Sequence, residues 1–258
     1  MLYAVERAGE ADMSGPVFLP ECPALLMEND LRVLVIADLH FGIESGLARS
    51  GVHVQSQSAA RAERALAAVR ETSPDLVLLL GDVKHSVPLT SRQEYAELPA
   101  ILDRFRRLAP LRVAPGNHDG GLARFLQEGE LLPAAGTVID GVGYLHGHTH
   151  PGPALLGRLI VCGHLHPVVS LTDEVGCSLR AEPAYLYSPL LGEYAGTETR
   201  LLVLPPACEF SGGVDVLGVG ESGLGPLARC IDQEHAEVWL RDGTYIGRLG
   251  EIREQRGA

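Results

Sequence analysis

The sequence lacks the features of membrane, secreted and disulfide-bonded proteins. Its 258 residues contain no apolar run of membrane-spanning length and no basic-then-apolar N-terminal signal, so we expect neither a membrane helix nor secretion. Its five cysteines are scattered without a Cys-x-x-Cys pair. This odd, dispersed set favours reduced thiols in a cytoplasmic protein over a disulfide framework.

Basic residues are also scarce. Lysine and arginine together number 21 against 33 acidic residues, for a net charge of −12. This balance argues against broad, nonspecific adhesion to nucleic acid. It does not exclude a local cationic site, because two divalent metals would offset four of those charges.

What is present is enough apolar material for a large core. Hydrophobic residues make up 46% of the chain and the mean hydropathy is +0.10. For this length we expect one domain over residues 1–258.

Five short apolar runs, each followed by a polar cluster, predict β-strands. Amphipathic helices are expected at 58–72, with Arg and Glu side chains on its exposed face, and at 92–108. This alternation indicates an α/β layered fold. Downstream we expect further strands, a Gly/Pro-rich loop region at 205–226 and a terminal hairpin around Asp242-Gly243. The predicted strands are 31–37, 75–80, 111–114, 142–145, 158–162, 168–171, 184–187 and 201–204.

Carboxylate, amide and imidazole side chains follow the first five strands. In α/β folds ligands collect beyond the carboxyl ends of the strands, so we expect these side chains to meet there. Such a mixed set suits manganese, iron or zinc and not calcium. The seven candidate ligands are Asp38, His40, Asp82, Asn117, His146, His164 and His166.

No single one of these clusters is specific, because each alone also fits an ordinary turn, a helix cap or a packed histidine. Their joint occurrence, each after its own strand, favours a metal site. A Gly-x-Gly-x-x-Gly sequence at 218–223 lacks the second parallel strand of a nucleotide-binding unit, and we interpret it as a flexible loop.

The order of these motifs resembles that of the calcineurin-like metallophosphoesterase superfamily. The resemblance covers residues 32–167 and implies an α-β-β-α sandwich with two facing mixed sheets, which a β-rich part at 168–250 completes. His85 in Gly-Asp-x-x-His is similar to the SbcD-type nucleases, and the whole chain resembles the small SbcD-related and DNA-ligase-associated phosphoesterases. The motifs are Asp38-x-His40, Gly81-Asp82, Gly116-Asn117-His118-Asp119, His146-Gly147 and Gly163-His164-x-His166.

The resemblance implies two divalent metal ions, with manganese expected first and iron, zinc or nickel as alternatives. One metal would take Asp38, His40 and His166, and the other Asn117, His146 and His164, with Asp82 bridging them. A shifted turn could exchange His146 for His148. Such a pair activates a bridging hydroxide for in-line attack on phosphorus.

The same resemblance suggests roles for the neighbouring residues. His118 would protonate the leaving oxygen or stabilise the transition state, and Asp119 would orient its ring. His85 and Lys84 are candidates for contact with the substrate phosphate, with a solvated loop as the alternative, and His148 would line the rim of the metal site.

The resulting hypothesis is a metal-dependent hydrolase of phosphodiesters or phosphomonoesters. Its substrate would be a phosphate ester, with a nucleotide or nucleic-acid end as one form, and no membrane partner is expected. A non-catalytic binding module on the same fold and a DNA-repair nuclease subunit are the alternatives. The sequence leaves the oligomeric state open.

Overall fold

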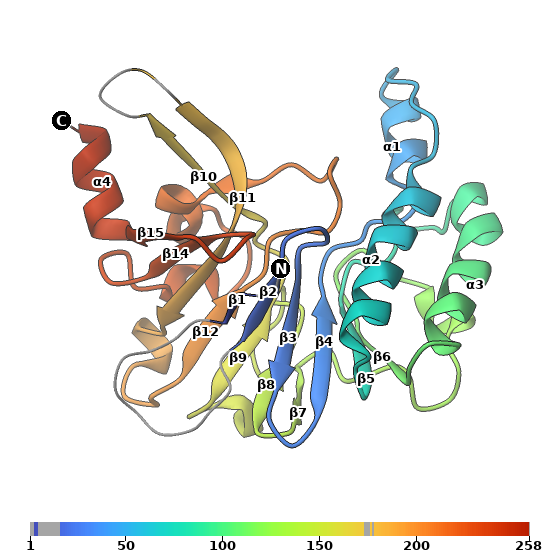
Figure 1. Ribbon diagram of the computed structural model, residues 1–258, viewed down its shortest axis with the longest axis horizontal. Helices are drawn as coiled ribbons and strands as arrows, with labels where there is room; N and C mark the ends of the chain where they lie inside the picture. The colour runs from blue at the N-terminus through green and yellow to red at the C-terminus, as the bar shows by residue number, and fades with distance from the viewer. Residues whose placement is uncertain (1–2, 5–15, 173–175, 177, 258) are drawn as a thin grey trace.

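Two β-sheets face each other in the computed structural model, which describes residues 3–4, 16–172, 176 and 178–257 (Figure 1). The first sheet has the order β1-β2-β3-β4-β5-β6, and β4, β5 and β6 run parallel. Its strands are β1 (Tyr3–Ala4), β2 (Val17–Leu19), β3 (Ala24–Glu28), β4 (Arg32–Ile36), β5 (Leu76–Leu80) and β6 (Leu111–Ala114).

The second sheet has the order β13-β10-β11-β12-β9-β8-β7, with β14 and β15 attached through β11. Its centre is parallel, because β9 pairs in that sense with both β8 and β12. The strands are β7 (Thr137–Ile139), β8 (Val142–Tyr144), β9 (Leu159–Cys162), β10 (Pro167–Thr172), β11 (Ser178–Pro189), β12 (Arg200–Val203), β13 (Val214–Asp215), β14 (Glu237–Leu240) and β15 (Tyr245–Arg248).

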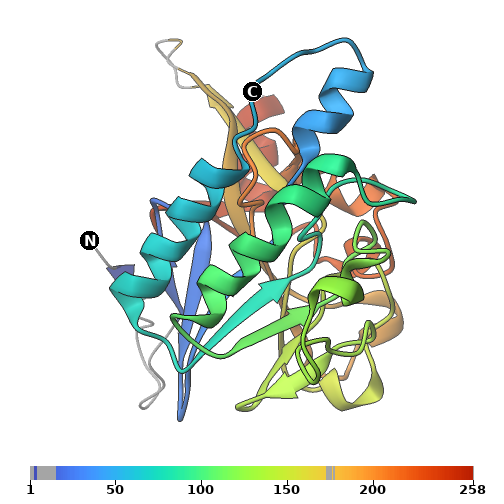
Figure 2. The same ribbon diagram turned by 90° about the vertical axis from the view of Figure 1, so that its right-hand side faces the viewer.

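Helices cover the outer face of each sheet. Helices α2 (Ser58–Thr72) and α3 (Arg92–Arg106) lie side by side on the first sheet (Figure 2). Helix α4 (Leu249–Gly257) and several 3₁₀ turns cover the second. Among the described residues, no helix is both long and apolar enough to cross a bilayer.

A third apolar cluster fills the space between the sheets. Leu25, Val35 and Leu78 of the first sheet pack with Val161 and Tyr185 of the second. The buried Tyr185 hydroxyl donates to the carbonyl oxygen of Ala24 across this layer at 2.8 Å. The predicted α-β-β-α sandwich with two facing mixed sheets is confirmed.

Local sequence explains the two long helices. Helix α2 buries the stripe that its periodicity predicted, Ala62, Ala65 and Val69 among others. Helix α3 begins at a capping box, in which Ser91 accepts from the Glu94 backbone and the Glu94 side chain accepts from Ser91.

Some sequence expectations were incomplete. Helices α1 (Ile43–Arg49) and α4 were not predicted, because each is short and α4 has a weak apolar face. The region 205–226, expected as loop, contains β13 and a 3₁₀ helix, η4 (Val216–Glu221).

The ion pair between Glu130 and Arg106 braces the segment that follows β6. Arg106 Nε and Nη2 each donate to a Glu130 oxygen at 2.8 Å, and these bonds, against the effect of burial, hold the pKa of Glu130 below its ordinary value of 4.5. We expect Glu130→Gln to lower the free energy of unfolding at pH 7 by about 2 kcal/mol, because a largely buried charge-assisted pair is lost. Urea unfolding would measure this.

The pH dependence of that difference follows from the sign of the shift. A carboxyl group whose folded-state pKa is depressed contributes its stability above its unfolded pKa and loses it as the pH falls through the folded value. The difference between the two proteins should therefore shrink below about pH 4.5. Glu128→Gln, at an exposed neighbouring position, is the control. A difference that stays constant down to pH 3 would contradict the assignment.

Candidate metal centre

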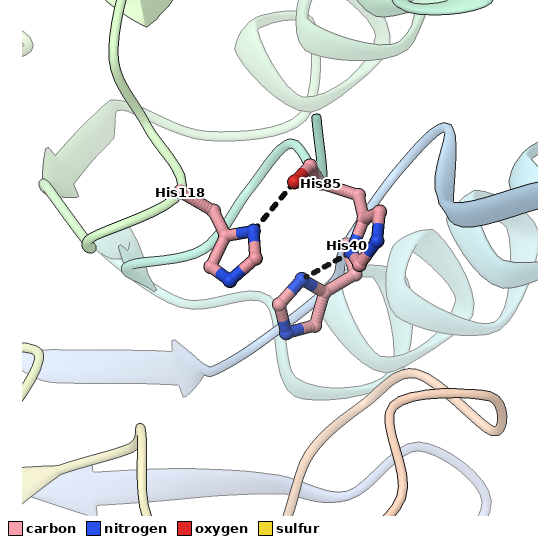
Figure 3. A group of neighbouring side chains, drawn as sticks. All are labelled: His40, His85 and His118. Atoms are coloured by element: carbon pink, nitrogen blue, oxygen red, sulfur yellow. Dashed lines mark hydrogen bonds between the residues drawn. The ribbon is translucent and has the colours of Figure 1, made fainter. Parts of the chain in front are cut away.

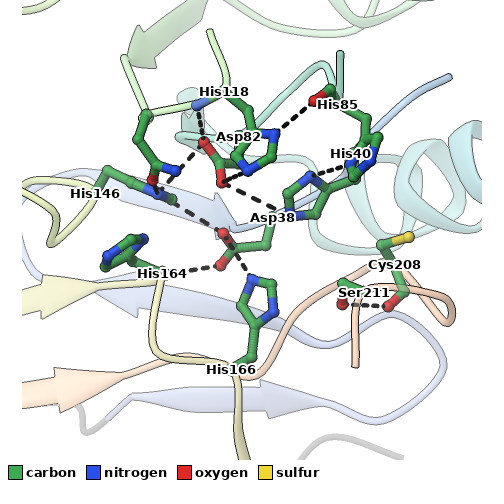
Figure 4. Close-up of polar contacts among 12 residues, drawn as sticks. Asp38, His40, Asp82, His85, His118, His146, His164, His166, Cys208 and Ser211 are labelled. Carbon is green, nitrogen blue, oxygen red and sulfur yellow. Dashed lines mark hydrogen bonds and ion pairs between the residues drawn. The ribbon is translucent and has the colours of Figure 1, made fainter. Parts of the chain in front are cut away.

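The carboxyl ends of parallel strands from both sheets meet at one edge of the sandwich. In the first sheet, β4, β5 and β6 are in parallel register, so the residues after each strand lie side by side. In the second sheet, β8 and β9 end at the same place. The structure brings all seven sequence-predicted ligands together there. Figure 4 shows the aspartates and histidines among them.

One cluster contains Asp38, His40 and His166. Each offers a ligand atom, and these atoms lie within 4.8 Å of one another. The Asp38 Oδ1 to His166 Nε2 distance is 3.2 Å. These three side chains come from the ends of β4 and β9, strands of different sheets.

A second cluster contains Asp82, His146 and His164, again with ligand atoms within 4.8 Å. Asp82 Oδ1 lies 3.5 Å from His146 Nε2, and the Asn117 Oδ1 lies 3.2 Å from the same nitrogen. Asn117 thus borders this cluster and not the first.

Asp82 lies between the two clusters. Its Oδ1 faces His146, whereas its Oδ2 lies 3.7 Å from His40 Nε2. The backbone N–H of His118 donates to Oδ1 at 2.8 Å and fixes the carboxylate in this orientation. This is the placement that a carboxylate shared by two cations requires.

The backbone at the site is strained. The described chain has nine non-glycine residues at positive φ, and five of them are candidate ligands. Such a conformation costs about 1–2 kcal/mol for a residue with a Cβ, and its concentration at one place is typical of a functional site. The five are Asp38, His40, Asp82, His164 and His166.

Two glycines of the motifs allow the backbone to approach the carboxylates. A Cβ at Gly116 would lie 2.1 Å from Asp82 Oδ1, and a Cβ at Gly163 would lie 2.4 Å from Asp38 Oδ2. The glycines are therefore required by close approach and not only by turn geometry.

Unpaired buried atoms indicate that the clusters suit a cation. Among the described residues, five buried side-chain polar atoms make no hydrogen bond of good geometry, and three of them are Asp38 Oδ1, His40 Nε2 and His166 Nε2. Asp38 Oδ1 and His166 Nε2 face each other at 3.2 Å. Such atoms are costly unless something pairs with them. A divalent cation would satisfy all three at once, so the residues present fit a metal.

The protonation behaviour of the histidines agrees with this. Burial lowers the pKa of His40 to about 3 and that of His164 to about 4, which keeps both neutral as metal ligands must be. Against burial, Asp82 and Asp38 raise the pKa of His146 to about 9. In the metal-bound protein, the cation would balance the charge of the two carboxylates in place of the proton on His146.

His146 rather than His148 occupies the inner position. The His146 side chain is fully buried, and its Nδ1 lies 3.0 Å from the Leu80 carbonyl oxygen, to which a protonated Nδ1 donates. The His148 ring lies outside it, with ring centroids 5.3 Å apart. His148 therefore borders the site, as expected of a rim residue.

His118 points into the site, but Asp119 does not orient its ring. His118 Nδ1 donates to the His85 carbonyl oxygen, and its Nε2 lies 4.0 Å from Asp82 Oδ2. The Asp119 oxygens instead accept from the backbone N–H groups of Lys84 and Gly116. The prediction for Asp119 was wrong, because its buried carboxylate fixes two loops and not the imidazole.

Lys84 does not face the substrate either. It is the only lysine in the sequence and is fully buried. Its ammonium donates to the carbonyl oxygens of Ser86 and His118. The prediction of a phosphate contact was wrong, since the ammonium instead holds the His118 loop against the loop after β5.

Lys84→Met tests this structural role. We expect the free energy of unfolding to fall by about 2–6 kcal/mol, because two carbonyl oxygens lose their buried donor at about 1–3 kcal/mol each. Urea denaturation of the metal-free protein measures it, with Arg92→Met, at an exposed position of α3, as the control. Unchanged stability together with a raised KM would instead restore the substrate contact.

The His85 ring lies next to the His40 ring (Figure 3). The Nδ1 atoms of the two rings are 3.3 Å apart, so one must donate and the other accept. The His85 and His118 rings stack at a centroid distance of 5.1 Å. His40, His85 and His118 form a third group whose ligand atoms lie within 4.8 Å.

The sequence interpretation missed two buried charges that support the site. Arg61 of α2, placed on the polar face from its residue type, is fully buried and pairs with Glu44 and Glu209 at 3.3 and 3.1 Å. Its spacing of four and eight residues from Ala65 and Val69 could have revealed this.

Glu94 is the second buried charge. Its Oε1 accepts from the backbone N–H groups of His85 and Ser86, at 3.0 and 2.6 Å. The Ser91-x-x-Glu94 capping box was the available signal. Glu94 thereby anchors the loop that carries His85.

Facing mixed sheets with Asp/His clusters at the strand ends define a metallophosphoesterase fold and site. Residues 31–168, which are 138 of the 258, match the profile of the calcineurin-like phosphoesterase family, and the chain belongs to that family. Its members are metal-dependent phosphoester hydrolases, and the Asp/His clusters offer donor atoms of the kind that a divalent metal requires.

One solved structure shares the fold over most of the chain, and a second gives a weaker match. Nuclease MPE of Pseudomonas putida is 18% identical with a TM-score of 0.58, and the match covers 94% of this chain and 98% of that one. The phosphoesterase YfcE of Escherichia coli is 15% identical with a TM-score of 0.41, covering 84% and 98%.

Proposed function

We propose that the protein is a dinuclear metal-dependent phosphodiesterase, with phosphomonoesters as a second substrate class. The observation that carries the proposal is the position of Asp82 between two clusters, one at His40 and one at His146. Asp38, His40 and His166 would hold one cation, and Asn117, His146 and His164 the other. Manganese is the first choice of metal for this mixed donor set, ahead of iron, zinc and nickel.

The bound cations would supply an activated water and neutralise the nonbridging oxygens of the phosphate. The protein's own residues then position and protonate the substrate. Asp82 would bind both cations, and the His118 backbone N–H fixes the orientation of its carboxylate.

His118 is the proposed acid. Because its Nδ1 donates to the His85 carbonyl, its second nitrogen, Nε2, is the one that faces the clusters. In its imidazolium form, His118 also carries a proton at Nε2, which can pass to the oxygen of the leaving group and leave a neutral imidazole. His118 would therefore matter most for esters whose leaving oxygen is strongly basic.

His85 is proposed as a positioning residue and no longer as a group that contacts phosphate. With His40 Nε2 directed at the metal clusters, its Nδ1 carries the proton and donates to His85 Nδ1. Metal-bound histidines usually make such a bond through the second nitrogen, which fixes the tautomer.

Metal analysis of the purified protein, combined with assays of bis- and mono-p-nitrophenyl phosphate, tests the function. We expect two manganese ions per chain after reconstitution, hydrolysis that a chelator abolishes, and faster turnover of the diester. Absence of turnover with every metal and both esters would refute the proposal and favour a non-catalytic binding module.

A nuclease activity is the second candidate. It is supported by the fold shared with a nuclease over nearly the whole chain and by His85 in an SbcD-like Gly-Asp-x-x-His motif. The net charge of −12 opposes a broad phosphate-binding surface. Binding of single-stranded and double-stranded DNA ends across a salt series would test it, because several phosphate contacts give a steep salt dependence.

A cytoplasmic location is part of the proposal. The four cysteines that the structure describes are all buried and unpaired: Cys22, Cys162, Cys208 and Cys230. This fits a reducing compartment.

A further inference from the structure

A cleft of about 340 Å³ adjoins the metal centre and has no part in the chemistry described so far. It is lined by His148, His150 and Arg229 and by Gly220, Gly223, Gly225 and Pro226 of a glycine-rich segment. Its size lies at the lower end of the ~300–1,000 Å³ of small-molecule sites. The ring centroids of His148 and His164 are 6.0 Å apart, so the cleft opens beside a candidate metal ligand.

The glycine-rich wall is built against the metal-bearing loop. Gly225 has φ +92°, and a Cβ there would lie 2.9 Å from the carbonyl oxygen of Gly147. Gly223 has φ +69°, and a Cβ at Gly220 would lie 2.7 Å from the Gln233 side chain. Backbone conformation favours glycine at 223 and 225, whereas a Cβ at Gly220 would meet only the end of the flexible Gln233 side chain. The three glycines present backbone without side chains to the cleft.

This wall contains the second and third glycines of the Gly-x-Gly-x-x-Gly sequence at 218–223. The segment follows the two-residue strand β13 and forms the 3₁₀ helix η4 and a turn, which is not the strand-turn-helix of a dinucleotide site. The motif therefore has a different use here, as one side of the cleft.

The opposite wall carries planar nitrogen-bearing groups. His148 Nδ1 is buried without a hydrogen-bond partner. His150 Nδ1 lies 3.0 Å from the Tyr194 hydroxyl, which fixes its ring. Arg229 donates to Glu193 at 2.7 Å, so its guanidinium is oriented and its charge is largely offset.

We propose that this cleft is a nucleoside subsite, which binds the base of an ester group attached to the scissile phosphate. Imidazole and guanidinium planes stack on bases, and bare backbone offers hydrogen bonds to their edges. None of the lining residues carries a carboxylate, and Glu193 behind them pairs with both His150 and Arg229, so the nearly neutral balance suits a base better than a second phosphate. The inference rests on the proposed phosphodiesterase activity and specifies its substrate class.

The arrangement also indicates which ester group enters the cleft. The His118 ring contacts the rings of His40 and His85, whereas the His148 ring contacts those of His146 and His164. The leaving group that His118 would protonate and the group bound in the cleft therefore lie on different sides of the metal centre. The subsite binds the nucleoside that remains on the phosphate.

Three diesters with the same p-nitrophenolate leaving group test the subsite. The retained group is methyl, abasic deoxyribose or thymidine attached through its 5′ oxygen. We expect kcat/KM for the thymidine ester to exceed that for the abasic ester by at least about fivefold, the lower end of the range for one base-stacking contact. Equal values for these two esters would overturn the proposal.

Arg229→Ala and His150→Ala should each reduce the thymidine-to-abasic ratio several-fold. The matched controls are Arg70→Ala, which removes a surface arginine that pairs with Glu63, and His53→Ala, at an exposed position. Both controls should keep the wild-type ratio. An unchanged ratio in both cleft variants would refute the assignment.

Direct binding separates this inference from the catalytic proposal. Thymidine 5′-monophosphate is titrated calorimetrically into the metal-free protein and into metal-free Arg229→Ala. Weaker binding by the variant supports the subsite even if no ester is hydrolysed, in which case only the proposed function fails. Equal binding by both proteins overturns the subsite even if the diesters are hydrolysed.

Discussion

Asp82→Asn is expected to reduce the bound metal from two ions per chain to one or none and to lower kcat/KM for a diester on the order of 10³-fold. The substitution keeps the shape of the side chain but removes its charge. It also turns an amide toward His40 or His146, which now lie 3.7 and 3.5 Å from the two carboxylate oxygens. Loss of several kcal/mol of charge stabilisation corresponds to about a thousandfold in rate.

Metal content by elemental analysis, measured with activity on the same sample, checks this. Asp30→Asn, at an exposed position, is the control and should keep both metals and full activity. Full metal loading with wild-type activity in Asp82→Asn would show that this carboxylate does not join the two clusters.

His118→Ala is expected to have an effect that depends on the leaving group. For a dinucleotide, whose alkoxide leaves poorly, kcat should fall about 10²–10⁴-fold, because the proton held at Nε2 is lost. For a p-nitrophenyl ester, whose leaving group needs no proton, the fall should be less than about tenfold.

The metal content of His118→Ala should remain that of the wild type, because His118 belongs to neither proposed ligand set. His53→Ala, at an exposed position, is the matched control. A fall in bound metal would instead make His118 a ligand together with His40 and His85, the third group whose ligand atoms lie within 4.8 Å. Equal losses for both leaving groups would remove the role as an acid.

The sequence predicted the layout of the metal-bearing edge well. The runs that end before Asp38, Asp82 and Asn117 are apolar enough to be buried strands. A polar side chain directly after such a strand lies at the edge of the sheet, because the strand itself is buried. Parallel pairing then brings these residues together. The approach of the second sheet, which carries His146 and His164, entered only through the family resemblance.

The roles of the supporting residues could not be predicted in the same way. Lys84 was assigned to the substrate from its charge and its place beside Asp82, but its ammonium reaches the carbonyls of Ser86 and His118 in the interior. Asp119 was assigned to the ring next to it in sequence, yet its oxygens bind Gly116 and Lys84 backbone. Both outcomes depend on how two loops dock, which no local pattern encodes.

By itself, the sequence determined the strands that precede the candidate ligands, their polar ends and the kinds of ligand atom available, because each of these depends on a few consecutive residues. It did not reveal β2, β3, β7 or β13. Tertiary structure decided which atoms share a cluster, that Asp82 stands between the clusters, and that a glycine-rich loop some seventy residues after His148 forms a cleft with it. The physical reason is that side-chain direction and burial at the site are set by contacts between the two sheets and their loops. Those contacts exist only once the whole chain has packed.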